Sequence, residues 1–194
     1  MNPRTKILRS GAIALVLSIA LTLTVWLGTV AVALAAPLQL AQASVSQAQA
    51  VVRSTEDPSV VLGEATFTEQ SDGLRVDVSL SNVPTGFHGF HIHEVGSCDT
   101  GGSAAGGHFN PLNVKHGYLV KDGFEAAHAG DLGNILILAD GSGELQETIS
   151  GLPLTEGETA ILNHAVILHS DRDDFGQPTG NAGGRIGCGI IEPA

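Results

Sequence analysis

The sequence predicts an all-β domain of eight short strands, an immunoglobulin-like Greek-key β-sandwich or flattened barrel with two long functional loops. Apolar residues occur in short runs separated by turn residues, which is typical of strands. Glycine is abundant at 25 residues and aromatic residues make up only 4%, a composition that a helical bundle would not need. Beyond the N-terminal region, no segment longer than a turn has a convincing helical period.

Residues 1–43 have the pattern of an export signal or an N-terminal membrane anchor. Arg4, Lys6 and Arg9 precede an uncharged apolar run at residues 12–36. This run of 25 residues is longer than an ordinary signal core and long enough to cross a bilayer. We favour a signal peptide cleaved after Ala43, with a retained anchor as the alternative. The protein is therefore expected to be exported, whether periplasmic, thylakoid-lumenal or extracellular.

The net charge of −11 is unevenly distributed along the chain. Residues 1–43 hold three basic residues and no acid, so residues 44–194 are three units more negative than the whole, at −14. Such an acidic domain repels nucleic acid and anionic membrane surfaces, which excludes nucleic-acid binding. Membrane association is expected only if the N-terminal segment is retained.

The strands of the domain are expected within residues 50–194, after an uncharged spacer at residues 44–49. Alternation of Leu74, Val76, Val78 and Leu80 with polar residues indicates a strand with one buried face. A tight turn precedes it at residues 71–73. The eight expected strands lie at residues 50–52, 63–69, 74–80, 87–95, 134–138, 145–149, 159–169 and 185–191.

Two Gly-rich stretches, at residues 96–130 and 170–184, have no sustained period and are expected to be loops. The first spans 35 residues, which is too long for a compact domain unless a metal or a disulfide organises it. The only two cysteines are Cys98 and Cys188. An even pair in an exported chain suits a disulfide, with two buried free thiols as the alternative.

His91 and His93, in the fourth expected strand, are separated by one residue. Side chains two residues apart on a strand point to the same face, so the two imidazoles are presented side by side. Imidazole pairs of this kind suit adjacent positions around zinc, copper, iron or nickel. The alternative for an isolated pair is an ordinary surface histidine, so the interpretation depends on further ligands downstream.

The first long loop supplies a second set of metal-binding side chains. It contains His108, His116 and His128, and Asp131 follows three residues after His128. Three imidazoles and one carboxylate form a closed tetrahedral set of the kind that zinc accepts. A zinc ion bound there would also explain how so long a loop is ordered.

A copper site is the corresponding hypothesis for the strand histidines. His91, His93 and His169 are strand or strand-end residues, and they need one more ligand for a tetragonal four-imidazole site, which copper favours. The ligands of both sites are complete if one histidine binds both metals. His108 is the natural candidate, although this count alone does not fix the bridge.

Several motifs in the chain resemble the Cu,Zn superoxide dismutase family, over about residues 48–193. The first family signature is similar to residues 89–94, Gly-Phe-His-Ile-His-Glu, together with Cys98. The second is similar to residues 180–189, Gly-Asn-Ala-Gly-Gly-Arg-Ile-Gly-Cys-Gly. The metal-binding loop of the family is similar to residues 107–111, 116–117 and 128–134.

The resemblance implies one copper and one zinc ion per chain. Copper would be held by four residues: His91, His93, His108 and His169. Zinc would be held by His108, His116, His128 and Asp131, with His108 as a bridging imidazolate. Asp173 would connect a copper histidine to a zinc histidine by hydrogen bonds that fix their tautomers.

The resemblance also implies the activity, in which two superoxide anions and two protons become dioxygen and hydrogen peroxide as copper is alternately reduced and re-oxidised. Arg185 would hold the superoxide anion and His108 would transfer a proton, so these are the expected catalytic residues. Cys98 and Cys188 would form the intrasubunit disulfide. A homodimer is expected. The alternative function is a non-catalytic copper/zinc-binding module or a copper chaperone domain.

The remaining histidines and the second loop complete the expectations. His88 is expected to have a structural hydrogen-bonding role, and His164 to be a surface or packing residue. From His169 to Arg185 there are only 16 positions, fewer than in the usual animal or plant member, and the segment contains Arg172 but no lysine. We therefore expect weak electrostatic steering of an anionic substrate.

Overall fold

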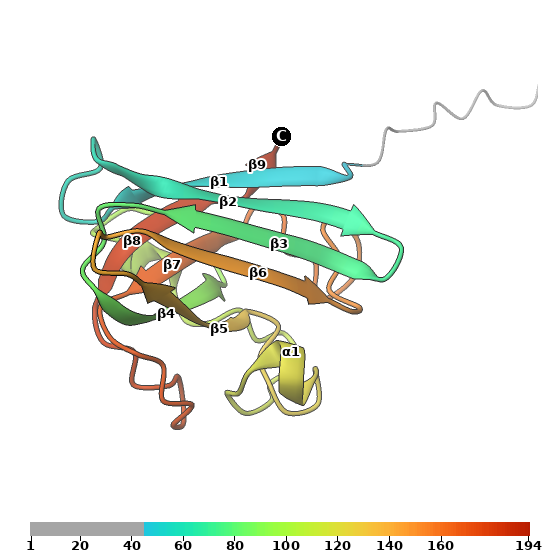
Figure 1. Cartoon of the computed structure of the whole chain (residues 1–194). Helices are drawn as coiled ribbons and strands as arrows, with labels where there is room; N and C mark the ends of the chain where they lie inside the picture. Colours follow the sequence, from blue (N-terminus) through green and yellow to red (C-terminus); the bar gives the residue numbers. More distant parts are fainter. Residues whose placement is uncertain (1–44) are drawn as a thin grey trace, which may run out of the picture. The chain divides into compact units, whose positions relative to one another are not determined.

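The computed structural model describes residues 45–194, in which the strands close into an antiparallel barrel (Figure 1). The predicted signal peptide or membrane anchor at residues 1–43 lies outside the described residues. Eight strands build the barrel: β1 (Gln47–Ser54), β2 (Val61–Gln70), β3 (Gly73–Leu80), β4 (Gly86–His93), β5 (Asp131–Ile137), β6 (Gly143–Ile149), β7 (Ala165–His169) and β8 (Arg185–Ile190). A two-residue strand, β9 (Glu192–Pro193), pairs with β1.

The strand order around the sheet is β2-β3-β6-β5-β4-β7-β8-β1, and a β1–β2 pairing closes it. Three neighbour pairs are far apart in sequence: β3 with β6, β4 with β7 and β8 with β1. This crossed connectivity confirms the predicted Greek-key all-β fold. The described helices are short, a 3₁₀ turn at Ser103–Ala105 and α1 at Leu119–Asp122, and none is long and apolar enough to cross a membrane.

Several predicted strand boundaries are wrong, including the start of β5, which is Asp131 rather than residue 134. β1 begins at Gln47 rather than residue 50, because Ala48 and Ala50 are fully buried and continue the inward face of Val52. The last part of the predicted spacer therefore belongs to the sheet. β7 begins at Ala165 rather than residue 159, and Asn163, two residues before it, has a left-handed backbone (φ 65°), which interrupts the extended conformation of a strand.

The barrel core is filled by the inward residues of every long strand. On β3 these are the predicted Leu74, Val76, Val78 and Leu80, which are at most 3% exposed. Phe67 of β2 is also fully buried. Burial of each large side chain contributes roughly 1.5–3 kcal/mol. The barrel is therefore a rigid support for groups that lie on its outer face.

β4 positions the site because its two halves pair with different strands. Its first half pairs with β5 and its second half with β7, and a register irregularity separates them between Gly89 and His91. Phe90 and Ile92 belong to the core of the barrel. His91 and His93 therefore face the opposite side, where they are 0% and 1% exposed because the two long loops cover them.

Candidate metal centre

The four histidines predicted for copper converge on one point. One ring nitrogen each of His91, His93, His108 and His169 lies within 4.8 Å of the others. The Nε2 atoms of His93 and His169 are 3.3 Å apart, and the rings of His91 and His108 lie 4.2 Å apart between centroids. β4 supplies the first two histidines, β7 supplies His169 and the long loop folds back to supply His108, through an isolated bridge to His93.

Each strand histidine of this cluster has one ring nitrogen engaged and one left for a ligand. His91 donates from Nε2 to Oδ2 of Asp173 at 2.8 Å, and its Nδ1 is buried without a partner. His93 donates from Nδ1 to the carbonyl of Gly106 at 3.0 Å. The Nδ1 atom of His169 lies 3.4 Å from the carbonyl of Gly183. Such outer bonds fix the ring orientation and tautomer of metal-binding histidines.

The predicted zinc set also converges, on the carboxylate of Asp131. Its oxygens lie 2.9 Å from Nδ1 of His108, 2.9 Å from Nδ1 of His116 and 3.1 Å from Nδ1 of His128. The His116 contact has no hydrogen-bond alignment although the nitrogen is buried. A close, misaligned nitrogen–oxygen pair is what two ligands of one ion present. The donor set, three imidazoles and one carboxylate, suits zinc.

His108 is shared by the two clusters. Its Nδ1 belongs to the Asp131 group, so its Nε2 is the atom left for the other cluster. The centroid of its ring lies 4.2 to 6.0 Å from those of five other histidines, three from the set predicted for copper and two from the set predicted for zinc. A single imidazole thus connects the two sets of ligands.

Asp173 joins the clusters on their other side. Its carboxylate is fully buried and contacts Nε2 of His91 at 2.8 Å and Nε2 of His116 at 3.0 Å. The residue is held by Asn134 of β5, which accepts from the Asp173 N–H at 2.8 Å and donates to its carbonyl at 2.9 Å. At Gly180 (φ 76°) an added Cβ would come within 2.6 Å of Nε2 of His116, so glycine allows the loop to approach.

Burial and contact set the charge states of the centre. Burial lowers the pKa of His93 to about 2, that of His108 to about 4 and that of His169 to about 3, which keeps these rings neutral. Burial acts to raise the pKa of Asp131, but its bonds to the three histidines outweigh it and the pKa falls well below the usual range. Burial acts to lower the pKa of His116, but its bonds to Asp131 and Asp173 outweigh burial and raise the pKa to about 9, so this ring gives up a proton when it binds metal as a neutral imidazole.

Arg185, at the start of β8, lies beside the four histidines predicted for copper, called the copper cluster below. It lines a cavity of about 230 Å³ together with His93, His108 and His169. Its guanidinium donates to the carbonyls of Gly102 and Gly106 in the first long loop. The positive charge is therefore fixed beside the histidines instead of moving on a free side chain, which suits recognition of a small anion.

Residues 61–191 match the model of the copper/zinc superoxide dismutase family. The chain belongs to this family. The match covers more than half of the sequence and includes every residue of the two clusters. The family prediction made from the sequence motifs is thereby confirmed.

Three solved structures resemble the chain over most of the barrel. The clock protein EA4 is 34% identical, with a TM-score of 0.68 over 77% of this chain and 95% of its own. A SOD-like protein from Bacillus subtilis is 33% identical, with a TM-score of 0.64 over 73% of this chain and 96% of its own. A double mutant of such a protein, in which a tyrosine and a proline are replaced by histidine, is 36% identical, with a TM-score of 0.66 over 74% and 96%.

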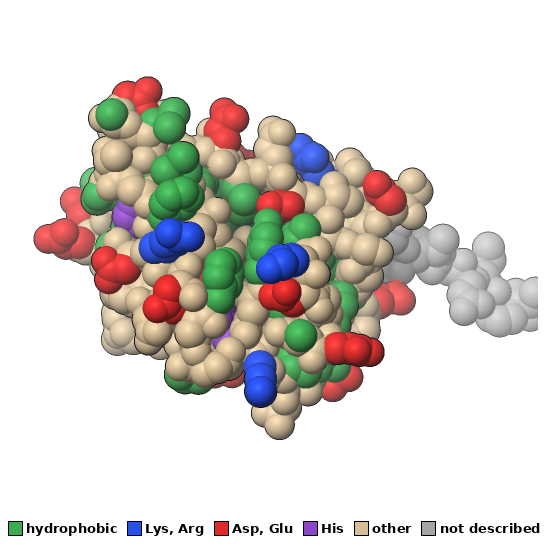
Figure 2. Space-filling model, turned by 60° about the horizontal axis from the view of Figure 1, so that its bottom comes forward, with side chains coloured by type: hydrophobic (Ala, Val, Ile, Leu, Met, Phe, Trp, Pro, Cys, Tyr) green, Lys and Arg blue, Asp and Glu red, His purple; other side chains and the backbone are tan. Residues whose placement is uncertain are grey.

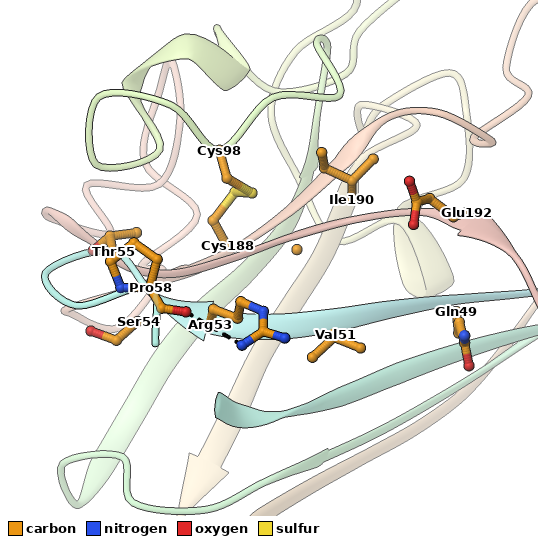
Figure 3. A pocket seen from close by; sticks show the side chains of 11 residues that line it. Gln49, Val51, Arg53, Ser54, Thr55, Pro58, Cys98, Cys188, Ile190 and Glu192 are labelled. Carbon is orange, nitrogen blue, oxygen red and sulfur yellow. Dashed lines mark hydrogen bonds between the residues drawn. A yellow bond between two sulfur atoms is a disulfide. The ribbon is translucent and has the colours of Figure 1, made fainter. Parts of the chain in front are cut away.

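Cys98 and Cys188 form a disulfide with an S–S distance of 1.99 Å, joining the first long loop to β8. A groove of about 350 Å³ lies beside it on the outer surface of the barrel (Figure 3). Val51 and Ile190 give the groove an apolar part, and Arg53 and Glu192 lie at its polar rim. The disulfide anchors the loop whose carbonyls bind Arg185. In this superoxide dismutase fold, the disulfide therefore helps to hold the arginine in position.

The other histidines lie outside both clusters, as predicted. His88 is buried, and its two ring nitrogens lie 2.8 Å from the carbonyls of His169 and Pro84, a structural hydrogen-bonding position. His164 is half-buried, stacks on Phe109 at 4.0 Å between centroids and contacts the carbonyl of His93. On the face shown in Figure 2, histidine reaches the surface only in small areas.

Sequence reasoning assigned no role to Asn134, Thr179, Asn181 or Gln177. Thr179 and Asn181 line the cavity in front of the copper cluster. Their signal was present, because Asn181 lies in the second signature and Thr179 directly before it. Asn134 and Gln177 act through side-chain amides on backbone groups far away in the sequence, a relationship that no local pattern reveals.

Proposed function

We propose that this chain is an active copper/zinc superoxide dismutase, which converts two superoxide anions and two protons to dioxygen and hydrogen peroxide. The observation that carries the proposal is that His108 belongs to both buried clusters while Arg185 faces the same cavity. A metal-binding module needs neither a shared imidazole nor a fixed cation at an open mouth. Their combination supports a redox site that receives an anion.

The donors fit the two metals. His91, His93, His108 and His169 offer four imidazole nitrogens, the set that suits copper, and His108, His116, His128 and Asp131 offer the set that suits zinc. The orphaned buried Nδ1 atoms of His91 and His116 support this assignment, since each would otherwise lack a partner. When bound, copper supplies one-electron redox chemistry and zinc supplies a fixed positive charge.

The residues of the site then have distinct roles in the reaction. Arg185 attracts and orients the anion with a charge that does not titrate near neutral pH. Nε2 of His108 is the atom at which a proton is held and from which it passes to the reduced substrate, because Nδ1 is directed to Asp131. Asp131 and Asp173 keep the imidazoles in their tautomers and orientations.

The location and assembly of the protein form part of the same proposal. The disulfide is consistent with export to an oxidising compartment, with the N-terminal segment as a cleaved signal or an anchor. We further propose a homodimer. Mass spectrometry of the mature N-terminus and light scattering of the purified protein test these two points, and a chain that begins at Met1 or Asn2 would contradict cleavage.

Metal analysis combined with an activity assay, on the wild type and on His108→Ala, tests the function. We expect one copper and one zinc per chain, with dismutation lost in the variant. Zinc alone without activity in the wild type would instead support the alternative of a non-catalytic metal-binding module or a copper chaperone domain.

A further inference from the structure

The short second loop contacts one zinc-cluster residue, His116, with three of its own side chains. Asp173, Phe175 and Gln177 are alternate residues of the loop. The Asp173 carboxylate binds Nε2 of His116 at 3.0 Å. The Phe175 ring stacks on the imidazole at 6.3 Å between centroids with planes 22° apart. Gln177 is bonded to the His116 backbone.

The Gln177 contact has two points. Its Oε1 accepts from the His116 N–H at 3.1 Å, and its Nε2 donates to the His116 carbonyl at 2.8 Å. No other backbone partner serves these two His116 groups within the described residues. His116 lies in the irregular 96–130 loop, where no strand pairing fixes its backbone, so the glutamine amide supplies the partners that a neighbouring strand would otherwise give.

The two loops are thereby joined directly beside the zinc cluster. Four residues after the buried Asp173, Gln177 brings the second loop back to the same histidine. Two residues further, Thr179 begins the wall of the cavity in front of the copper cluster. The segment that holds a zinc ligand from behind therefore continues into the segment that shapes the entrance for the substrate.

We propose that Gln177 is a positioning residue for zinc: it fixes the backbone of His116, so that the imidazole is set for the ion before the ion arrives. The inference rests on the proposed two-metal function, but it concerns retention of zinc and not catalysis itself. Gln177 is not one of the four donors of the zinc cluster and does not line the substrate cavity. Loss of its amide leaves all four donors present and releases the backbone that carries one of them.

Zinc release from the metal-loaded full chain tests the proposal, measured as the rate of transfer to a chromogenic chelator. Gln177→Met keeps the length of the side chain and removes both hydrogen bonds. Gln146→Met, at an exposed position on β6, is the matched control. We expect zinc to leave Gln177→Met about tenfold to a hundredfold faster, the usual range for outer partners of metal ligands, and Gln146→Met to match the wild type.

A second variant separates positioning from general damage to the fold. Gln177→Glu retains an acceptor for the His116 N–H and loses the donor, so its rate should lie between those of the wild type and Gln177→Met. All four zinc-free proteins should still unfold in one cooperative transition, because the two hydrogen bonds lie in the loops and not in the barrel core. Equal zinc release from Gln177→Met and the wild type overturns the inference and leaves the enzyme proposal intact. A wild type that binds no zinc overturns both.

Discussion

Asp131 of β5 is the strand partner of His91 of β4, so a residue of the zinc cluster and a residue of the copper cluster sit opposite each other in the same antiparallel pair. The two candidate metal sites therefore share a rigid backbone connection in addition to the shared imidazole of His108 and the Asp173 bridge. A structural change in either cluster is therefore expected to affect the other through three connections: the strand pair, His108 and Asp173. The predictions below use these connections.

The Asp173 bridge predicts coupled loss of both metals. Asp173→Asn removes the charge that faces His91 and His116 and retains the size of the side chain. We expect both zinc and copper to bind about tenfold to a hundredfold more weakly, as for other outer partners of metal ligands. Competition with chelators of known affinity measures this. Asp72→Asn, in the exposed turn before β3, is the control, and a variant that weakens one metal alone would contradict the bridge.

Arg185 is expected to act on substrate capture and not on metal binding. In Arg185→Ala the cavity loses its fixed cation, so kcat/KM should fall by roughly ten- to a thousandfold, the range of rate gains that charge in a cleft supplies. Metal content should stay at the wild-type level. Pulse radiolysis together with metal analysis gives both quantities. Loss of metal in parallel with activity would show that the residue has a structural task instead.

Steering at long range should be weak because Arg172, the one basic residue of the second loop, does not line the cavity. Its guanidinium lies 5.1 Å from the ring of the exposed Phe87, and neither residue lines the entrance. We expect kcat/KM to rise or stay flat as salt is added, since the domain is strongly acidic and salt screens its repulsion of the anion. A steep fall with salt would contradict this, and Arg172→Ala should leave the rate unchanged.

The disulfide should stabilise both the fold and the arginine. Cys98 and Cys188 close a segment with a sequence separation of 90 residues, and its loss is expected to cost about 2–5 kcal/mol in the free energy of unfolding. Denaturant unfolding of the Cys98→Ser/Cys188→Ser variant measures that change. Activity should fall as well, because the loop carbonyls that hold Arg185 are no longer anchored. Full activity with lowered stability would show that the disulfide stabilises the fold but is not needed to position Arg185.

Much of the fold followed from local patterns. The alternation at residues 74–80 correctly identified β3 and its buried face, because side-chain period and burial agree there. The start of β1 was missed because Gln47 and Ala48 belong to an uncharged Ala/Gln stretch, whose small residues fit a barrel interior without forming a hydrophobic run. The predicted start of β7 is too early because residues 159–164 are apolar in part but contain Asn163, whose backbone is left-handed.

For the candidate site, the metal-binding residues could be named from the sequence, but the residues that hold them in position could not. The His-x-His pair and the loop histidines have residue types and spacings that suggest metals, and the structure gathers them into two buried groups. Asn134 and Gln177 belong to no such pattern. They bind backbone groups 39 and 61 residues away, and those distances in sequence become contacts only after the barrel closes and both loops fold over β4.

β1 closes the barrel and covers the edges of its neighbouring strands. It is paired on both sides, with β2 along its length and with β8 and β9 at its ends. While it stays in place, each of the eight barrel strands of residues 45–194 has a hydrogen-bonded neighbour on both sides. If it detaches, the backbones of β2 and β8 become open templates for strand addition, the usual route to aggregation of β proteins. A strand that bears no metal ligand thus protects its two neighbours from strand addition by another molecule.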